Sequence, residues 1–227
     1  MIDRNLMIND QYKFISVDIP RTACSARARL FAGVPDHVFM GPDMQAWMNA
    51  VFWSDIPKHA RALQYRQCAA EKFESYYKYS FVRNPWDRQV SLFSNLCQLK
   101  PSLIYPEGKH LDVSFREWIK SDAIKINTRL PMRISGLYKK LPQLHWLVDD
   151  NRKIIVDFVG KFENFQHDFL YVVDKIGIRS DILHENKTVH DHYLSYYDEE
   201  SIDIVYKWMK DDCDTFGYEK PKLSENS

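Results

Sequence analysis

The sequence predicts an α/β domain with a central parallel sheet and helices on both faces. Three segments of the chain predict this fold, because each contains an apolar strand that is followed, directly or after a short loop, by a helical pattern. The strands are expected at residues 14–17, at 77–82 and within the segment 153–164, with helical patterns after each of them. Strands that alternate with helices pair in parallel, and their carboxyl ends meet at one edge of the sheet.

Length and composition limit the classes of function. With 227 residues and 45% hydrophobic content, the chain can bury the core of one domain, which we expect to span 1–227 with its core at 12–218. The 31 basic and 31 acidic residues cancel, whereas a general binder of nucleic acid or of membrane surfaces usually has a basic excess. We therefore expect no nucleic-acid partner and no membrane partner, and any anion site must be local.

Cysteine usage and the chain's apolar runs suggest neither a metal site nor a membrane segment. The four cysteines are far apart without C-x-x-C spacing, so neither zinc nor a disulfide framework is expected. The N-terminal segment lacks the apolar core of a secretory signal, and no run of about 18 apolar residues is present. These observations predict a cytoplasmic protein without a metal cofactor.

The first strand, Phe14–Val17, runs into the loop Asp18–Ser25, and a helical run follows. A strand, a tight loop and a helix in this order aim backbone N–H groups at an anion. The G-x-x-x-x-G-K-[ST] spacing of a Walker A loop is missing, which weakens the hypothesis of a kinase or nucleoside triphosphatase.

His59 is a candidate general base. Residues 34–75 are expected to be mainly helical after a short strand at 38–40. His59 lies in the segment Lys58–Ala62, which we expect inside the second helix of this region. An imidazole can take a proton near neutral pH. A lone histidine is more often structural, so both interpretations of His59 stay open.

The second strand, Tyr77–Val82, turns into a helix at Arg83. Asn84 is a favourable N-cap, and Pro85 fits the first helical turn. Arg83 is therefore expected at the carboxyl end of the strand, beside the N–H groups of the new helix, with Ser91 two turns further on. A guanidinium, a hydroxyl and a helix end suit a phosphate. The alternative is an ordinary solvated helix start with local ion pairs.

The region up to residue 145 is the hardest to interpret. A surface loop is expected over 101–111, and a short helix over 113–120 with Asp112 or Ser114 as its cap. The basic side chains that follow are expected on a solvated face. They are Arg129, Arg133, Lys139, Lys140 and His145.

The third strand is apolar enough to be buried within the sheet, and the helix after it carries an apolar face from Phe165 to Val173. Lys161 and Glu163 lie at the junction and are expected to serve local structure first. A final amphipathic helix is expected from about Glu199 to Cys213.

Residues Arg83 to Ser91 match every defined position of the pattern R-N-P-x-D-R-x-x-S. This stretch resembles the 3′-phosphate-binding motif of sulfotransferases that use 3′-phosphoadenosine 5′-phosphosulfate (PAPS), of the carbohydrate sulfotransferase type. Weaker resemblances occur in the expected order. They are Lys58–Ala62 to an H-A-x-A segment, Val156–Asn164 to a segment that returns to the nucleotide, Asn186–Thr188 to an N-[KS]-T loop, and Asp212–Tyr218 to a terminal D-x-x-x-F-G-Y.

The loop from Pro20 resembles the 5′-phosphosulfate loop of the same family, P-K-T-x-G-T-S. Pro20 and Thr22 match, and Ser25 supplies a hydroxyl where the family carries threonine. Arg21 replaces lysine, which keeps the charge but changes its geometry. Cys24 replaces glycine, which adds a side chain where the backbone would approach the phosphate, and Ala26 replaces the last serine.

The resemblance implies a three-layer P-loop-like sulfotransferase fold and a set of site residues. Arg21, Thr22, Ala23, Cys24 and Ser25 would bind the 5′-phosphosulfate, and Arg83 and Ser91 would bind the 3′-phosphate. Lys187 would close a loop over the nucleotide. His59 and Arg21 would act in catalysis.

The resemblance also implies a co-substrate, an acceptor and a location. PAPS would donate a sulfuryl group, without a metal, to a hydroxyl on a glycan or on a glycosylated or small metabolite. Animal relatives work in the Golgi behind a membrane anchor. A homodimer is compatible with the aromatic content. A nucleotide-binding or interaction module that has lost transfer is the alternative, because Arg21 and Cys24 depart from the motif.

Overall fold

The computed structural model describes residues 8–22, 37–38, 59–98, 114–121, 139–178 and 192–223. Contacts within the chain divide it into two compact units. Unit 1 comprises residues 1–83 and 143–187, and unit 2 comprises residues 84–142 and 188–227. The chain passes from unit 1 to unit 2 between Arg83 and Asn84, within the R-N-P motif.

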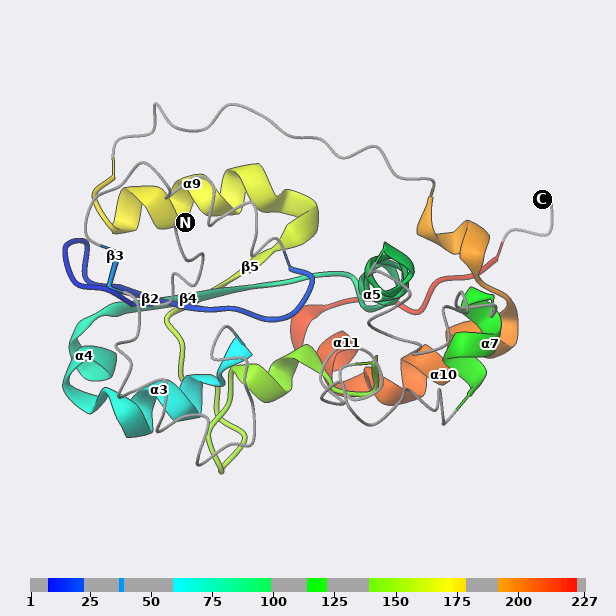
Figure 1. The fold of residues 1–227 in the computed structure, drawn as a ribbon, viewed down its shortest axis with the longest axis horizontal. Helices are drawn as coiled ribbons and strands as arrows, with labels where there is room; N and C mark the ends of the chain where they lie inside the picture. Colours follow the sequence, from blue (N-terminus) through cyan, green and yellow to red (C-terminus); the bar gives the residue numbers. More distant parts are fainter. Residues whose placement is uncertain are drawn as a thin grey trace. The chain divides into compact units, whose positions relative to one another are not determined.

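The sheet of unit 1 has five strands among the described residues (Figure 1). The strands of its parallel part are β2 (Phe14–Val17), β4 (Tyr77–Val82) and β5 (Phe158–Lys161). Beyond β2, β1 (Ile8–Asn9) pairs antiparallel with β2 and with β3 (His37–Val38). The first two predicted strands and the parallel pairing are confirmed.

Helices cover both faces of this sheet, as predicted. In Figure 1, α9 (Phe165–Lys175) lies along one face, and α3 (Ala62–Cys68) and α4 (Ala70–Ser75) lie along the other. One apolar core packs strand rings against α9, and burial of its apolar surface stabilises this layer. It consists of Phe14, Tyr79, Phe81, Phe169, Val172, Val173 and Ile176. Unit 1 is therefore a three-layer α/β structure.

The third strand lies within the expected segment 153–164, but it is shorter than the apolar run. Ile154 forms an isolated antiparallel bridge with Val148, and the Ile155 N–H donates to the Leu147 carbonyl oxygen at 2.9 Å. The first half of the apolar run thus folds back locally, and only its end enters the sheet as β5, which is half-buried apart from Gly160. A strand within the expected segment is confirmed, but it is only partly buried, because a local hairpin uses the first half of the apolar run.

Unit 2 is helical in its described residues. It contains α5 (Pro85–Gln98), α7 (Phe115–Lys120), the 3-10 helix η5 (Tyr193–Tyr196), α10 (Glu199–Trp208) and α11 (Lys210–Phe216). The single final helix that we predicted is two helices, since the backbone leaves helical geometry at Met209. Met209 is fully buried, and both helices place apolar residues in one core with Trp86, Trp118 and Ile202.

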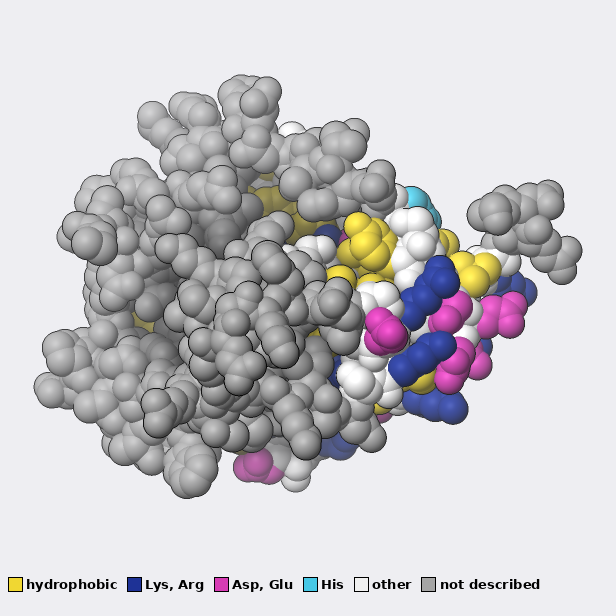
Figure 2. All heavy atoms as spheres, turned by 45° about the vertical axis from the view of Figure 1, so that its right-hand side comes forward, with side chains coloured by type: hydrophobic (Ala, Val, Ile, Leu, Met, Phe, Trp, Pro, Cys, Tyr) yellow, Lys and Arg dark blue, Asp and Glu magenta, His cyan; other side chains and the backbone are white. Residues whose placement is uncertain are grey.

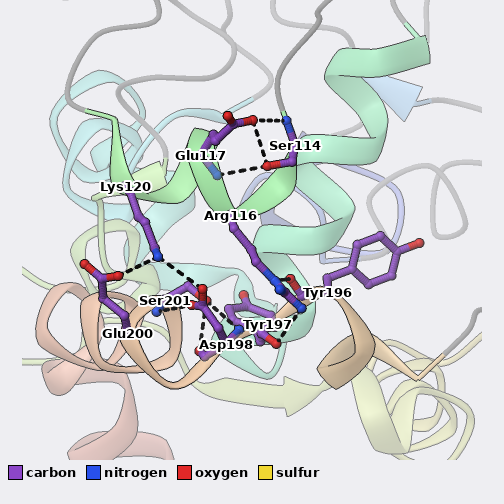
Figure 3. Close-up of polar contacts among 9 residues, drawn as sticks. All are labelled: Ser114, Arg116, Glu117, Lys120, Tyr196, Tyr197, Asp198, Glu200 and Ser201. Carbon is purple, nitrogen blue, oxygen red and sulfur yellow. Dashed lines mark hydrogen bonds and ion pairs between the residues drawn. The ribbon is translucent and has the colours of Figure 1, made fainter. Parts of the chain in front are cut away.

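A network of polar contacts fixes α7 to the start of α10 (Figure 3). Ser114 caps α7 together with Glu117, as predicted, whereas Asp112 lies outside the described residues. Arg116 donates to the carbonyl oxygens of Tyr196 and Tyr197, each at 3.2 Å. Lys120 lies 3.1 Å from a carboxylate oxygen of Asp198, which caps α10.

Lys139 corrects the prediction of a solvated basic face. Its side chain is buried, and Nζ donates to the carbonyl oxygens of Trp118 at 2.5 Å and of Ser121 at 2.7 Å. These carbonyl groups and the Trp118 ring take the place of water around the ammonium group. His145 is half-buried, and Arg129 and Arg133 lie outside the described residues.

Basic and acidic side chains are mixed on the described part of unit 2 that Figure 2 brings forward. Ion pairs within unit 2 join Lys120 with Glu200 and Lys220 with Asp203. A surface of mixed sign creates no extended field that attracts anions.

Candidate active site

The loop after β2 is held by its own side chains. The buried Thr22 hydroxyl donates to the Ile19 carbonyl oxygen at 2.9 Å, and the Ser16 hydroxyl donates to the Asp18 carboxylate at 2.8 Å. Arg21 has φ of 70°, in the left-handed region that residues other than glycine rarely adopt. The described loop therefore ends in a tight turn that presents a half-exposed arginine. Ala23, Cys24 and Ser25 lie outside the described residues.

Arg83 lies at the carboxyl end of β4 and is 6% exposed. Its Cζ atom is 4.1 Å from the centre of the Phe162 ring, a distance at which a guanidinium is attracted to the ring face. Its Nη1 donates to the carbonyl oxygen of Arg21 at 3.3 Å. The two arginines that the sequence singles out thus meet at the carboxyl edge of the sheet.

His59 contacts the same loop. Its Nδ1 lies 2.8 Å from the carbonyl oxygen of Asp18. Because a carbonyl oxygen only accepts, Nδ1 carries the hydrogen, and in the neutral ring Nε2 carries the lone pair. A ring in this tautomer is suited to take a proton at Nε2.

His59 has 3-10 helical geometry, and the residues just before it lie outside the described ones, so its place within an expected helix stays a prediction. Arg61 is the N-cap of α3, with extended backbone angles, and its N–H donates to the Gln64 side chain at 2.6 Å. This cap starts α3 at Ala62, and His59, in 3-10 geometry, belongs to the connection before it. The Nε1 of Trp146 donates to the His59 carbonyl oxygen at 3.0 Å and holds that connection.

His145 precedes Trp146, the residue that contacts His59. Burial lowers the pKa of its imidazole to about 4, and the positive charge of Arg61 adds to this effect. The ring is therefore neutral at physiological pH. The Arg61 Nε donates to the His145 carbonyl oxygen at 2.9 Å, so the two residues are tied through the backbone.

Ser91 lies in the second turn of α5 and is half-buried. The start of this helix is as predicted, since the Asn84 side-chain oxygen accepts from the N–H groups of Trp86 at 3.0 Å and Asp87 at 3.2 Å. Arg83 belongs to unit 1 and Ser91 to unit 2, so their joint role at a phosphate stays a prediction. Lys187 lies outside the described residues.

Sequence reasoning missed three side chains of this site. They are Phe162, which faces Arg83, Gln143, which bonds the Arg83 backbone, and Trp146, which holds His59. The only signal for Phe162 was its place in the segment after the third strand, where Lys161 and Glu163 drew attention instead. The backbone N–H of Lys161 donates to the Asp168 carboxylate at 2.7 Å, and the role of the lysine side chain stays a prediction.

An α/β sheet with two arginines and a histidine gathered at the carboxyl edge of its parallel strands defines a protein of the type that binds ligands outside this edge. The chain belongs to the sulfotransferase family, whose model matches residues 4–219. No solved structure matches the chain.

Relatives in animals and in an archaeon are similar to this chain. Carbohydrate sulfotransferase 14 of Danio rerio is 22% identical over 245 aligned positions, which cover 97% of this chain and 64% of the relative. The human protein of that name is 30% identical over 95 residues, or 40% of this chain and 23% of the relative. An uncharacterized protein of Archaeoglobus fulgidus is 31% identical over 123 residues, which cover 53% of this chain and 85% of the relative.

These relatives correct the predicted location. The expectation of a cytoplasmic protein is wrong, because the chain's animal relatives are carbohydrate sulfotransferases, the group for which the resemblance implies a Golgi location. Among the described residues, no helix has the length and apolar character needed to cross a membrane. In the same part of the chain, His, Cys, Asp and Glu side chains form no group of three or more that would hold a metal ion.

Proposed function

We propose that this protein is a PAPS-dependent sulfotransferase that transfers a sulfuryl group to an acceptor hydroxyl on a glycan or on a glycosylated or small metabolite. The proposal rests above all on one observation, the meeting of Arg21, His59 and Arg83 around the loop after β2. Membership of the sulfotransferase family and the names of the relatives support the same reaction and a carbohydrate acceptor.

The nucleotide would be held by its two phosphate ends. Arg21, Thr22, Ser25 and the amides of Ala23 and Cys24 would bind the 5′-phosphosulfate. Arg83 and Ser91 would bind the 3′-phosphate and distinguish PAPS from ATP, since a guanidinium forms bidentate contacts with phosphate oxygens. Lys187 would close over the bound nucleotide.

The transfer would depend on position and charge. The acceptor oxygen attacks sulfur, the bond from sulfur to the bridging phosphate oxygen breaks, and 3′,5′-adenosine bisphosphate leaves. Arg21 would stabilise the charge that develops on the leaving phosphate. His59 would take the hydroxyl proton at Nε2, because its Nδ1 already donates to Asp18.

The alternative is a nucleotide-binding or interaction module of the same fold that has lost transfer. Arg21 and Cys24 favour this alternative, because the phosphosulfate loop of the resembled family carries lysine and glycine there. Ligand binding alone does not separate the two hypotheses. Release of 3′,5′-adenosine bisphosphate that depends on an acceptor supports the enzyme, whereas binding without such release supports the module.

Thermal unfolding with added nucleotides tests the nucleotide site. A ligand at about 100 times its Kd adds roughly 2.7 kcal/mol to the free energy of unfolding. We expect 3′,5′-adenosine bisphosphate to raise the Tm well above the effects of adenosine 5′-monophosphate and ATP at equal concentration. Equal or absent shifts with all three nucleotides would contradict the proposal.

A further inference from the structure

The short 3-10 helix η2 (Gln143–Trp146) contacts several residues of the candidate site. Trp146 donates to the carbonyl oxygen of His59, and the carbonyl oxygen of His145 accepts from Arg61. Its first residue, Gln143, bonds Arg83. One four-residue turn thus holds the backbone next to both the expected phosphate ligand and the expected base.

The contact of Gln143 with Arg83 is the most specific of these. The Gln143 side chain is 0% exposed, its Oε1 accepts from the Arg83 N–H at 2.9 Å, and its Nε2 donates to the Arg83 carbonyl oxygen at 2.8 Å. A single amide therefore satisfies both backbone groups of Arg83, as a neighbouring strand does for a strand residue. Both hydrogen bonds are buried, so a side chain without these groups would remove two buried hydrogen bonds from the Arg83 backbone.

The position of Arg83 in the sheet explains what this contact contributes. The ladder between β4 and β5 ends with Val82 opposite Lys161, so Arg83 is the first residue beyond it. The side-chain amide of Gln143 continues the backbone hydrogen bonding of the sheet to Arg83. A fixed backbone sets the direction of the Arg83 side chain, whose guanidinium then lies over Phe162 and against the carbonyl oxygen of Arg21.

We propose that Gln143 is a positioning residue for recognition of the 3′-phosphate, acting through Arg83. The inference rests on the proposed function, because it assumes that Arg83 binds this phosphate. Gln143 acts on the arginine backbone, and the guanidinium meets the nucleotide. The preference for a 3′-phosphorylated nucleotide over the same nucleotide without that phosphate therefore depends on Gln143.

Calorimetric titration of the full chain measures this preference as the ratio of Kd for adenosine 5′-monophosphate to Kd for 3′,5′-adenosine bisphosphate. Gln143→Leu removes both hydrogen bonds at similar side-chain size. We expect the ratio to fall about tenfold or more, since a displacement of about 1 Å in a site costs up to about 100-fold. The affinity for the monophosphate should change by less than about threefold, because that ligand lacks the 3′-phosphate.

Gln89 offers a matched control. It is also 0% exposed, and its Nε2 donates to the backbone carbonyl oxygen of Lys139 at 2.7 Å, within unit 2. Gln89→Leu should lower stability as a loss of buried polar contacts does, but should leave the nucleotide ratio at the wild-type value. An equal fall of the ratio in Gln89→Leu and Gln143→Leu would reduce Gln143 to a general structural residue and overturn the inference.

Gln143→Glu supplies a readout that a purely structural role would not produce. A protonated carboxyl group has one donor and one acceptor, like the amide, whereas a carboxylate only accepts and would repel the Arg83 carbonyl oxygen. Burial favours the protonated form. The ratio for Gln143→Glu, divided by the wild-type ratio at the same pH, should therefore rise as pH falls from about 8 to about 5.

The outcomes separate the inference from the proposed function. A Gln143→Leu protein with the wild-type preference overturns the inference alone. If Gln143→Leu does not fold, Gln143→Glu decides, and a relative ratio that is constant across pH overturns the inference. A wild-type protein without preference for the bisphosphate overturns the proposed function, and the inference is lost with it.

Discussion

Replacement of His59 by asparagine tests the proposed base without removing its structural hydrogen bond. The imidazole Nδ1 lies 2.8 Å from the Asp18 carbonyl oxygen, and an asparagine side-chain amide is also a donor. Asparagine has no nitrogen that takes a proton at neutral pH. The substitution therefore separates the position of the loop from proton transfer.

The substitution should cause a large loss of rate and only a small change in stability. A positioned general base contributes about 100- to 10,000-fold to rate, which corresponds to about 2.7–5.4 kcal/mol in the activation free energy. Stability should change by less than the roughly 0.5–1.5 kcal/mol of one hydrogen bond, because asparagine keeps a donor. We expect kcat for sulfuryl transfer to fall by about 100-fold or more, with little change in the Kd for 3′,5′-adenosine bisphosphate.

Steady-state kinetics with PAPS and titration with 3′,5′-adenosine bisphosphate measure the two effects on one preparation. His167→Asn is the matched control, because His167 is an exposed histidine on α9, and its kcat should equal that of the wild type. A His59→Asn protein with wild-type kcat would refute the reasoning and remove His59 from the mechanism. A parallel loss of binding and turnover would instead assign His59 to the structure of the loop.

Three further predictions concern phosphate binding, packing and pH. Arg83→Ala should weaken 3′,5′-adenosine bisphosphate binding by about 1.5–3 kcal/mol, the range for a hydrogen bond to a charged group, and spare adenosine 5′-monophosphate in calorimetric titration; equal losses for both ligands would argue against a 3′-phosphate contact. Gly160→Ala should lower the free energy of unfolding in urea by about 1–3 kcal/mol, since a Cβ there would lie 2.5 Å from the Phe81 ring; an unchanged urea midpoint would contradict this packing. The pKa of His145 is about 4 in the folded chain, below the ordinary 6.5, so the unfolded state binds a proton first as pH falls. The free energy of unfolding should therefore drop by about 1–2 kcal/mol between about pH 6.5 and pH 4, after allowance for solvent screening. His145→Gln should flatten this dependence; a change of the urea midpoint between pH 7 and pH 5 that is the same in the wild type and in His145→Gln would count against it.

The first two parallel strands and the helix after the second were predictable because their signals are local. Phe14–Val17 and Tyr77–Val82 are short apolar runs bounded by turn residues, and Asn84 with Pro85 marks a helix start within three residues. Such signals need no knowledge of the rest of the chain. The parallel order of the strands follows from the helical segments between them.

The third strand and the last helix show where local signals fail. The pairing of Ile154 with Val148 competes with the sheet for one apolar run, and periodicity does not reveal which partner wins. The break at Met209 lies within a continuous amphipathic pattern, because α10 and α11 place apolar residues in the same core. Both differences arise from tertiary contacts that override the local pattern.

Part of the candidate site was also predictable from local signals, and part of it depends on tertiary contacts. The meeting of Arg21 with Arg83 follows from two parallel strands whose carboxyl ends share one edge. Gln143 lies 60 residues from Arg83 in the sequence, and a buried glutamine has no local signature. Phe162 is an ordinary aromatic residue until the fold places its ring under a guanidinium.

Transfer of labelled sulfate from PAPS to a panel of glycan and small hydroxyl acceptors tests the central proposal most directly. The full chain should place label on at least one acceptor, with release of an equal amount of 3′,5′-adenosine bisphosphate. Arg83→Ala and His59→Asn should each reduce both signals, whereas His167→Asn should reduce neither. Tight binding of the bisphosphate without label on any acceptor would contradict the enzyme and favour the non-catalytic module.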